Sequence, residues 1–512
     1  MSIDNVPHTY RAAKSHPNSG KWKVAMEREL HNLQKNNTWD LVPLPAGWRA
    51  FPNKWVYSYI VGPKVAERLE KEWTEELAKN GSQMNEGMLA HLRQVAESGS
   101  QILEKARLVA RGDLQKSGID YCQTFAPVVK FVSLRVLLTY VGLRRFSTKH
   151  YDIESAFLHG KVDPEVYMQQ PQGFEDGTNR VCKLNKAIYG LCQAARQFYL
   201  RLDEILRDIG YQRLSADWAI WAQEDGAFIV VHVDDMFAAG SPEQLQTAYN
   251  QLTKYLTVKD LGEMRRYLGL EIRYDEGVFY ICQQQYAWKI LDEFRFLDAS
   301  SAPTPMLDSE KWDGVDSPLL DTIVKENYQS AIGMLLYLMH GSRPDISYPV
   351  IKLSQYSSCP RRCHWEGIKR IFRYIKGTLH QALCLGDLPA LEGKVSTMGL
   401  LAYFDSAHAD NADKRSTCGY IFLLYGGLIS WATRVQKTIA LSSTGAEYMA
   451  GTEAAREAVW LKGLTDAIFR TEYSSSYTIQ WPIQLRGDNQ GSLSLANNPQ
   501  FHKRTKYIVL RQ

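Results

Sequence analysis

The most constraining feature of this sequence is residues 228–237, an apolar and β-branched run that holds the adjacent acids Asp234 and Asp235. Such a run predicts two buried strands joined at a hairpin tip, because β-branched and aromatic side chains favour strands and Asp favours turns. Successive side chains on a strand point to opposite faces, so one Asp aims into a site and the other needs the turn. An Asp pair can also simply begin a turn.

A second acid with apolar neighbours, Asp152, makes the turn explanation incomplete. Phosphoryl transfer with two metal ions about 3.5 to 4 Å apart needs clustered carboxylates, because Mg²⁺ prefers oxygen ligands and the ions stabilise both the attacking and the leaving oxygen. The acids Asp152, Asp234 and Asp235 therefore indicate metal-dependent phosphoryl transfer.

Length and composition exclude several other classes of protein. With 512 residues, 45% of them apolar, the chain is too long to form a single hydrophobic core and too apolar to be disordered. Three or four globular units are therefore expected. A net charge of +4 says little about partners. No apolar run approaches the roughly 18 residues that span a bilayer, and the N-terminus has no signal-peptide apolar region. We therefore expect a soluble intracellular protein without a membrane partner.

The hydrophobic pattern predicts an irregular succession of helices and strands, which is typical of an α+β fold. In the first part of the chain, we expect a helix through Trp22 and Leu33, strands at 39–42 and 54–60, a helical hairpin inserted at 64–104, extended segments at 107–111 and 125–132, and a helix at 133–143. In the second part, we expect a linker at 299–325, helices at 328–339 and 364–376, strands from Leu400 and at 428–431, a long helix at 446–469 and a strand ending at Leu485.

Basic residues are unevenly distributed. Residues 104–149 hold nine Lys or Arg against three acids, and the helix at 364–376 adds Lys369, Arg370, Arg373 and Lys376. These are either solvated basic faces or contacts to a phosphate backbone, and the sequence leaves both interpretations open. Cys359, Cys363 and His364 look like half a zinc site, but no second ligand pair follows, so zinc is not favoured.

Ten short blocks occur in the order seen in copia-type retrotransposon reverse transcriptases. They are KARLVARG at 105–112, TFAPV at 124–128, DIESAFLHG at 152–160, AIYGL at 187–191, VDDM at 233–236, KDLGE at 259–263, YLGLE at 267–271, RPDI at 343–346, HW at 364–365 and RYIKGT at 373–378. From about residue 7 to 511, the chain therefore resembles the reverse transcriptase and RNase H region of copia-type Pol polyproteins.

This resemblance implies a right-hand polymerase with fingers, palm and thumb, followed by a connecting segment and an RNase H-like α/β domain. The implied boundaries are an N-terminal helix and strand leading into the fingers at 1–50, fingers, palm and thumb at 51–298 with the inserted hairpin at 64–104, linker and connection helices at 299–395, and the RNase H-like domain at 396–512.

The resemblance also implies roles for single residues. Asp152, Asp234 and Asp235 would be the catalytic Mg²⁺ ligands of the palm, and Phe157 would exclude a ribose 2′-hydroxyl. The other implied nucleotide-binding residues are Lys105, Arg107, Gln193 and Lys259, and Gly269 resembles a primer-contacting turn. Cys192 and Ala195 depart from the Lys and Pro usual in the family, which predicts a less rigid loop around Gln193.

Asp405, Glu447 and Asp488 would form an RNase H site that binds two Mg²⁺ ions. Alternatively, Glu447 complements the dipole of the long helix. The family's closing block normally continues with a His and an Asp where this chain has Tyr507 and Val509, and the sequence ends at Gln512. We therefore expect the RNase H domain to be incomplete at its C-terminus and weakly active.

The function implied by the resemblance is RNA-directed DNA synthesis with Mg²⁺ or Mn²⁺. The expected partners are an RNA template, a DNA primer, RNA–DNA hybrid, deoxynucleoside triphosphates and a Gag-derived particle, in the cytoplasm or the nucleus. The alternative is a decayed or domesticated copy that binds nucleic acid without catalysis. An unrelated cellular polymerase or nuclease would not explain ten blocks in order.

Overall fold

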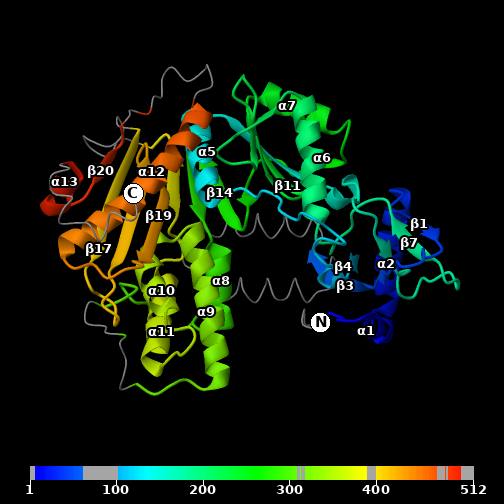
Figure 1. The fold of residues 1–512 in the computed structure, drawn as a ribbon, viewed down its shortest axis with the longest axis horizontal. Coiled ribbons are helices and arrows are strands. Elements are labelled where there is room, and N and C mark those ends of the chain that lie inside the picture. Colours follow the sequence, from blue (N-terminus) through cyan, green and yellow to red (C-terminus); the bar gives the residue numbers. More distant parts are fainter. Residues whose placement is uncertain are drawn as a thin grey trace. The chain divides into compact units, whose positions relative to one another are not determined.

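The computed structural model describes residues 6–61, 102–307, 312, 317–388, 399–469, 479 and 482–497. Helices and sheets are mixed along these residues, as expected (Figure 1). The chain forms two compact units from interleaved segments. The first unit comprises Met1–Pro127, Ile153–Ile209 and Leu252–Val258, and the second comprises Val128–Asp152, Gly210–Gln251 and Lys259–Gln512.

The first unit begins with helices α1 (Tyr10–Ser15) and α2 (Ser19–Lys35). The predicted apolar stripe of α2 is confirmed, since its buried residues are Trp22, Ala25, Met26, Leu30 and Leu33. A four-stranded sheet follows in the order β1 (Trp39–Val42), β7 (Val181–Leu184), β6 (Tyr167–Met168) and β2 (Ala50–Phe51). The unit also contains η1 (Gly112–Leu114), η2 (Ala156–His159) and α6 (Ala194–Asp208).

Strands β3 (Asn53–Val61) and β4 (Ile102–Ala110) form an antiparallel pair in the first unit. The predicted helical hairpin at 64–104 falls mostly outside the described residues. Its predicted end is wrong, because residues 102–104 belong to β4, where they pair with β3.

The second unit contains a six-stranded sheet. Its order is β12 (Val258–Asp260), β5 (Ser147–Ile153), β11 (Asp235–Gly240), β10 (Phe228–His232), β9 (Ile220–Ala222) and β8 (Gln212–Arg213). Helices α5 (Phe131–Leu143) and α7 (Pro242–Leu252) accompany it. The hairpin predicted at 228–237 is confirmed by the antiparallel pairing of β10 and β11.

The predicted extended segment at 125–132 is wrong at its end, where residues 131 and 132 are helical. Residues 125–130 form no strand, and α5 begins at Phe131. From Ser133 onward every residue of α5 is buried. A helix that is buried on all sides carries no amphipathic period that would mark its first turn in the sequence.

A layer of helices in the second unit consists of α8 (Gln284–Glu293), α9 (Thr322–Gly341), η3 (Pro344–Ile346), α10 (Ser347–Ser354) and α11 (Arg362–Gly377). The linker predicted to end at residue 325 ends earlier, because Asp321 caps α9 by accepting a hydrogen bond from the backbone of Val324. A further sheet has the order β13 (Arg266–Tyr267), β14 (Leu270–Asp275), β15 (Val278–Cys282) and β16 (Leu383–Gly386).

The C-terminal sheet of the second unit has the order β19 (Gly427–Val435), β18 (Thr417–Leu424), β17 (Leu400–Ala407) and β20 (Gln484–Arg486). Its only parallel pair is β17 with β20, within the described strands. Helix α12 (Ser443–Phe469) packs along this sheet and α13 (Gln490–Asn497) follows β20 (Figure 1).

Within the described ranges, no helix has the length and apolar content that crossing a bilayer requires.

Candidate active sites

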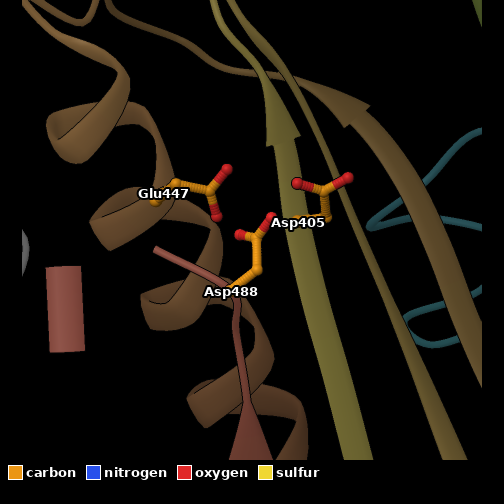
Figure 2. Close-up of side chains that lie close together, drawn as sticks. All are labelled: Asp405, Glu447 and Asp488. Carbon is orange, nitrogen blue, oxygen red and sulfur yellow. The ribbon is translucent and has the colours of Figure 1, made fainter. Parts of the chain in front are cut away.

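Three acids from separate elements of the C-terminal sheet and helix meet in one place (Figure 2). Asp405 lies on β17, Glu447 on α12 and Asp488 just after β20. Each contributes a carboxylate oxygen, and these oxygens lie within 4.8 Å of one another. The parallel pairing of β17 and β20 explains the meeting: Tyr403 pairs with Arg486, and Asp405 and Asp488 each lie two residues further along the same direction.

The backbone near this cluster is held by close packing. A Cβ atom built on Gly487 would lie 2.5 Å from the ring of Phe404, and one on Gly451 would lie 3.2 Å from it. Gly487 precedes Asp488 and Phe404 precedes Asp405, so only a glycine lets the two chain segments approach this closely.

Glu447 is the buried member of the cluster, with a relative exposure of 5%, whereas Asp405 and Asp488 are exposed. Its Oε1 accepts hydrogen bonds from the backbone N–H of Ser406 at 3.0 Å and from the Ser406 hydroxyl at 2.9 Å. Its Oε2 is buried and has no hydrogen-bond partner among the described residues. Burial raises the pKa of Glu447, and the negative charge of Asp405 raises it further, while the two bonds from Ser406 oppose the shift.

A divalent cation fits this arrangement. An unpaired buried carboxylate oxygen is costly, and two exposed carboxylates beside it complete a set of hard oxygen ligands. The alternative that Glu447 serves the helix dipole is less consistent with the structure. Helix α12 begins at Ser443 and has no acid in its first turn, where a dipole interaction is strongest.

The structure also brings two acids of the first predicted site side by side. Asp152 on β5 lies directly opposite Asp235 on β11. His232 pairs with Asp235, so Val233 and Asp234 form the turn of the hairpin. Val233 has a φ of 60°, a left-handed conformation that is strained for a β-branched residue. This turn places Asp234 next to the paired acids.

His150 contacts one of these acids through its side chain, since its Nε2 meets Oδ1 of Asp235. In the described structure, the oxygens of Asp152, Asp234 and Asp235 do not gather as tightly as those of the C-terminal cluster. The convergence of all three on one metal site stays a prediction.

The predicted nucleotide-binding residues of the first unit lie on two elements. Lys105 and Arg107 are on β4, two residues apart and therefore on one face, and Phe157 is in η2. Tyr189 contacts two of them: the Arg107 guanidinium lies 4.7 Å from the Tyr189 ring centroid, and the Phe157 ring packs edge-on at 4.6 Å. Tyr189 lies in the AIYGL block at 187–191, and no separate sequence signal marks it as a contact of these residues.

Gln193 is buried, with a relative exposure of 1%. Its side chain donates to the carbonyl of Asp120 at 3.3 Å and accepts from Gln115 at 3.1 Å. The amide therefore holds the surrounding loops in this structure, and its contact with a nucleotide stays a prediction. Lys259, in the second unit, is exposed at the edge strand β12.

The basic stretch at 104–149 is not one solvated face. Arg135 is buried at 2% exposure, and three of the other cations pair with acids, in the pairs Arg111–Asp113, Arg145–Asp387 and Lys149–Asp260.

Three cations of α11 donate hydrogen bonds to residues 299–304, at the start of the predicted linker. Arg370 donates to Thr304, Arg373 to the carbonyl and hydroxyl of Ser300, and Lys376 to the carbonyl of Ala299. These three side chains therefore bind the protein itself, rather than lying on a purely solvated face.

His364 has both ring nitrogens in hydrogen bonds to the backbone. Its Nδ1 accepts from Arg361 N–H at 3.0 Å and its Nε2 donates to the carbonyl of Trp312 at 2.8 Å. Burial lowers the pKa of His364, which favours this neutral form. Neither nitrogen is left for a metal, so Cys359, Cys363 and His364 do not make a zinc site.

Comparison with known proteins gives the family. A family model described as reverse transcriptase (RNA-dependent DNA polymerase) matches residues 90–308. A putative transposon Ty5-1 protein of Saccharomyces cerevisiae is 33% identical over 60% of this chain and 99% of its own length. The retrovirus-related Pol polyprotein from transposon TNT 1-94 of Nicotiana tabacum is 32% identical over 100% of this chain and 36% of its own length.

A similar match is found in Arabidopsis thaliana. The retrovirus-related Pol polyprotein from transposon RE1 is 33% identical over 98% of this chain and 32% of its own length. The chain thus spans about a third of the length of these Pol polyproteins. It belongs to the copia-type retrotransposon Pol family and contains a reverse transcriptase domain of that family.

Proposed function

We propose that this chain is an RNA-directed DNA polymerase that makes complementary DNA from the RNA of a copia-type element. The observation that carries the proposal is the pairing of Asp152 with Asp235 beside the turn that holds Asp234. In a chain of the reverse transcriptase family, adjacent carboxylates at the end of a buried sheet suit a site for divalent cations.

The three acids would hold Mg²⁺ or Mn²⁺. When bound, these ions supply Lewis-acid stabilisation of the attacking and leaving oxygens. His150 would fix the orientation of the Asp235 carboxylate, because its ring contacts one of the two oxygens.

Roles toward the incoming nucleotide rest on the resemblance and on local geometry. Lys105 and Arg107 would bind the triphosphate, and Tyr189 would keep the Arg107 guanidinium in place. Phe157 would exclude the ribose 2′-hydroxyl, and Gln193 would support the nucleotide. Lys259 would donate a proton to the pyrophosphate leaving group.

The architecture we propose follows the same family. The sheet that contains β5, β10 and β11 would be the palm, and β3 with β4 would belong to the fingers. Residues 299–395 would form the linker and connection helices, and residues 396–512 an RNase H-like domain.

In the RNase H-like domain, Asp405, Glu447 and Asp488 would hold the cations that direct water onto an RNA phosphate. What supports this assignment is the unpaired buried oxygen of Glu447 within a cluster of three carboxylates. Tyr507 and Val509, which stand where the family has a His and an Asp, lie outside the described residues. We propose that this second activity is impaired.

The partners we propose are an RNA template, a DNA primer, RNA–DNA hybrid and deoxynucleoside triphosphates, within a Gag-derived particle in the cytoplasm or the nucleus. A decayed copy that binds nucleic acid without catalysis has no structural observation in its favour.

Primer extension on an RNA template with Mg²⁺ tests the polymerase proposal. Asp234→Asn should abolish extension and leave binding to a primer–template duplex largely intact, because cationic contacts supply most of the affinity for nucleic acid. Asp275→Asn is the matched control, since Asp275 is an exposed acid on β14 of the same unit. An unaltered chain without activity in Mg²⁺ or Mn²⁺, or an active Asp234→Asn variant, would contradict the proposal.

A further inference from the structure

One serine contacts two of the three carboxylates of the C-terminal cluster. Ser406 follows Asp405 on β17, and its backbone N–H lies 2.7 Å from Oδ1 of Asp405 and 3.0 Å from Oε1 of Glu447. Its hydroxyl donates a second hydrogen bond to the same Glu447 oxygen at 2.9 Å. Ser406 therefore stands between two negative side chains and donates to both.

These contacts make the Glu447 carboxylate asymmetric. Oε1 accepts two hydrogen bonds, whereas Oε2 is buried and has no hydrogen-bond partner in the part of the chain that the structure describes. Figure 2 shows the carboxylate of Glu447 facing those of Asp405 and Asp488. Oε1 is thus occupied by hydrogen bonds, and Oε2 is the oxygen of Glu447 that is left to bind a cation.

The terminal torsion of a glutamate is broad, so packing alone does not fix the plane of its carboxylate. A hydrogen bond to a charged group is stronger than one between neutral groups. Two such bonds to one oxygen define the orientation of Glu447. Without the hydroxyl, only the backbone N–H of Ser406 holds Oε1, and repulsion from Asp405 favours rotation of the carboxylate away from the cluster.

We propose that Ser406 is a positioning residue. It binds Oε1 of Glu447 so that Oε2 remains directed at the site of a divalent cation. This inference rests on the proposed metal-binding function of the C-terminal cluster and adds a residue that acts on the metal only through Glu447.

Metal affinity of the full chain tests the proposal without relying on catalysis. Mn²⁺ binding is measured by calorimetry in a background with Asp152→Asn and Asp234→Asn, so that the heat reports on the C-terminal cluster. Ser406→Ala removes the hydroxyl but keeps the backbone donor, and it should weaken Mn²⁺ binding about tenfold, as loss of a residue that orients a metal ligand does. Ser406→Thr keeps the hydroxyl and should bind nearly as tightly as the background protein.

The matched control is Ser430→Ala. The Ser430 hydroxyl on β19 donates to Oε1 of Glu457 at 2.7 Å, a comparable Ser–Glu bond to another glutamate of helix α12, away from the acidic cluster. Its loss should leave Mn²⁺ affinity unchanged. If RNA cleavage is measurable, Ser406→Ala should raise the half-saturating Mg²⁺ concentration more than it lowers the rate at saturating metal.

The outcomes separate this inference from the function on which it rests. If Ser406→Ala binds Mn²⁺ as tightly as the background, or if Ser430→Ala weakens it equally, Ser406 does not position Glu447. If the background protein shows no Mn²⁺ binding that Asp405→Asn removes, the metal assignment itself is wrong. Thermal melting checks the fold, and Ser406→Cys, a weak donor of similar size, serves if Ser406→Ala does not fold.

Discussion

At the scale of single residues, Tyr189 connects two side chains that the resemblance assigns to the nucleotide. The Arg107 guanidinium lies over the Tyr189 ring in a cation–π contact, and the same ring packs edge-on against Phe157. Aromatic pairs and cation–π contacts each contribute on the order of 1 kcal/mol, enough to favour one rotamer of each partner. Phe157 is therefore a fixed ring, which a steric filter requires.

Replacing that ring should relax the choice of sugar. Phe157→Ala removes the ring that we propose excludes a 2′-hydroxyl, and entry of a ribonucleotide needs no new hydrogen bond. We expect the preference for deoxynucleotides over ribonucleotides to fall by about tenfold or more, comparable to the loss of a few buried carbon atoms from a specificity pocket. Single-nucleotide extension with each nucleotide type measures the ratio.

Phe174→Ala is the control for this change, since Phe174 packs edge-on against Trp55 in the same unit at 5.9 Å. An unchanged ratio in a Phe157→Ala variant that still extends primers would assign the filter to another residue.

At the scale of elements, two motif blocks of the first unit meet through their glycines. A Cβ atom on Gly112 would overlap the carbonyl oxygen of Gly190, and one on Gly190 would overlap that of Ala110. Gly190 also has a φ of 92°. The glycines of the blocks at 105–112 and 187–191 are therefore required by the close approach of two backbones.

This contact predicts a large effect of a small substitution. Gly112→Ala should lower the free energy of unfolding by about 1 to 3 kcal/mol, because the added methyl group meets backbone that must move. Gly20→Ala on α2 is the control: nothing lies within 4 Å of its Cβ position, so it should be neutral or stabilising. Thermal melting of both variants checks the prediction, and a similar midpoint for both would show that the contact is not tight in solution.

Helix α11 allows a test of how its basic face is used. Arg373 donates from Nε to the carbonyl of Ser300 at 2.8 Å, and the Arg373 carbonyl accepts from Ala302 N–H at 3.1 Å. We expect Arg373→Ala to lower the melting temperature and to leave the salt dependence of duplex binding unchanged.

If Arg373 contacted a phosphate, its loss would instead reduce the slope of the logarithm of the binding constant against the logarithm of salt concentration by roughly one. Lys369→Ala is the control, because Lys369 forms an ion pair with Glu366 on the surface of the same helix and should affect melting little. A reduced salt slope in Arg373→Ala would favour phosphate contact after all.

At the scale of the whole molecule, a buried arginine joins distant parts of the second unit. The Arg135 guanidinium on α5 donates to the carbonyl of Ile429 at 2.9 Å, to that of Gly341 at 3.1 Å and to that of His340. It also stacks on Trp431 at 3.8 Å. Burial lowers the pKa of Arg135 to about 9, so the group stays charged at neutral pH and its donors remain available.

A lysine also joins the helical layer of the second unit to the loop of its C-terminal sheet. Lys352 on α10 forms an ion pair with Asp410 at 2.8 Å and also donates to Asn411, in the loop between β17 and β18. The segment that follows Asp405 is therefore held by the helical layer of its own unit.

The two proposed activities of the chain should differ in rate. Three carboxylates can hold one cation, but Val509 stands where the family has a fourth acid, and an apolar side chain cannot hold a hydrated ion. Taking the loss of one transition-state contact as roughly 3 kcal/mol, we expect RNA cleavage to be slower than DNA synthesis by about two orders of magnitude. One RNA–DNA hybrid should serve both assays.

Val509→Asp should raise RNA cleavage, and Asp405→Asn should abolish what remains while leaving DNA synthesis unchanged. Robust cleavage by the unaltered chain that Asp405→Asn removes would show that three carboxylates suffice.

The sequence by itself determined the features that depend on neighbours along the chain. The apolar stripe of α2 is marked by helical periodicity, the hairpin of β10 and β11 by an apolar, β-branched run that holds two Asp residues, and the family by the ordered blocks. These signals work because helix and strand periods are properties of short segments. Where burial on all sides erases the period, as in α5, the sequence does not mark the first turn.

Only the tertiary structure decided which polar groups meet. Several such contacts join residues far apart in the sequence. Ser406 donates to Glu447, and Tyr189 contacts Arg107 and Phe157. The buried amide of Gln193 donates to Asp120, and Arg373 of α11 donates to Ser300. Hydrogen bonds and ring contacts act over a few ångströms, so their partners are set by how elements pack. The sequence shows that a serine or an arginine is present, whereas the fold decides which groups its side chain contacts.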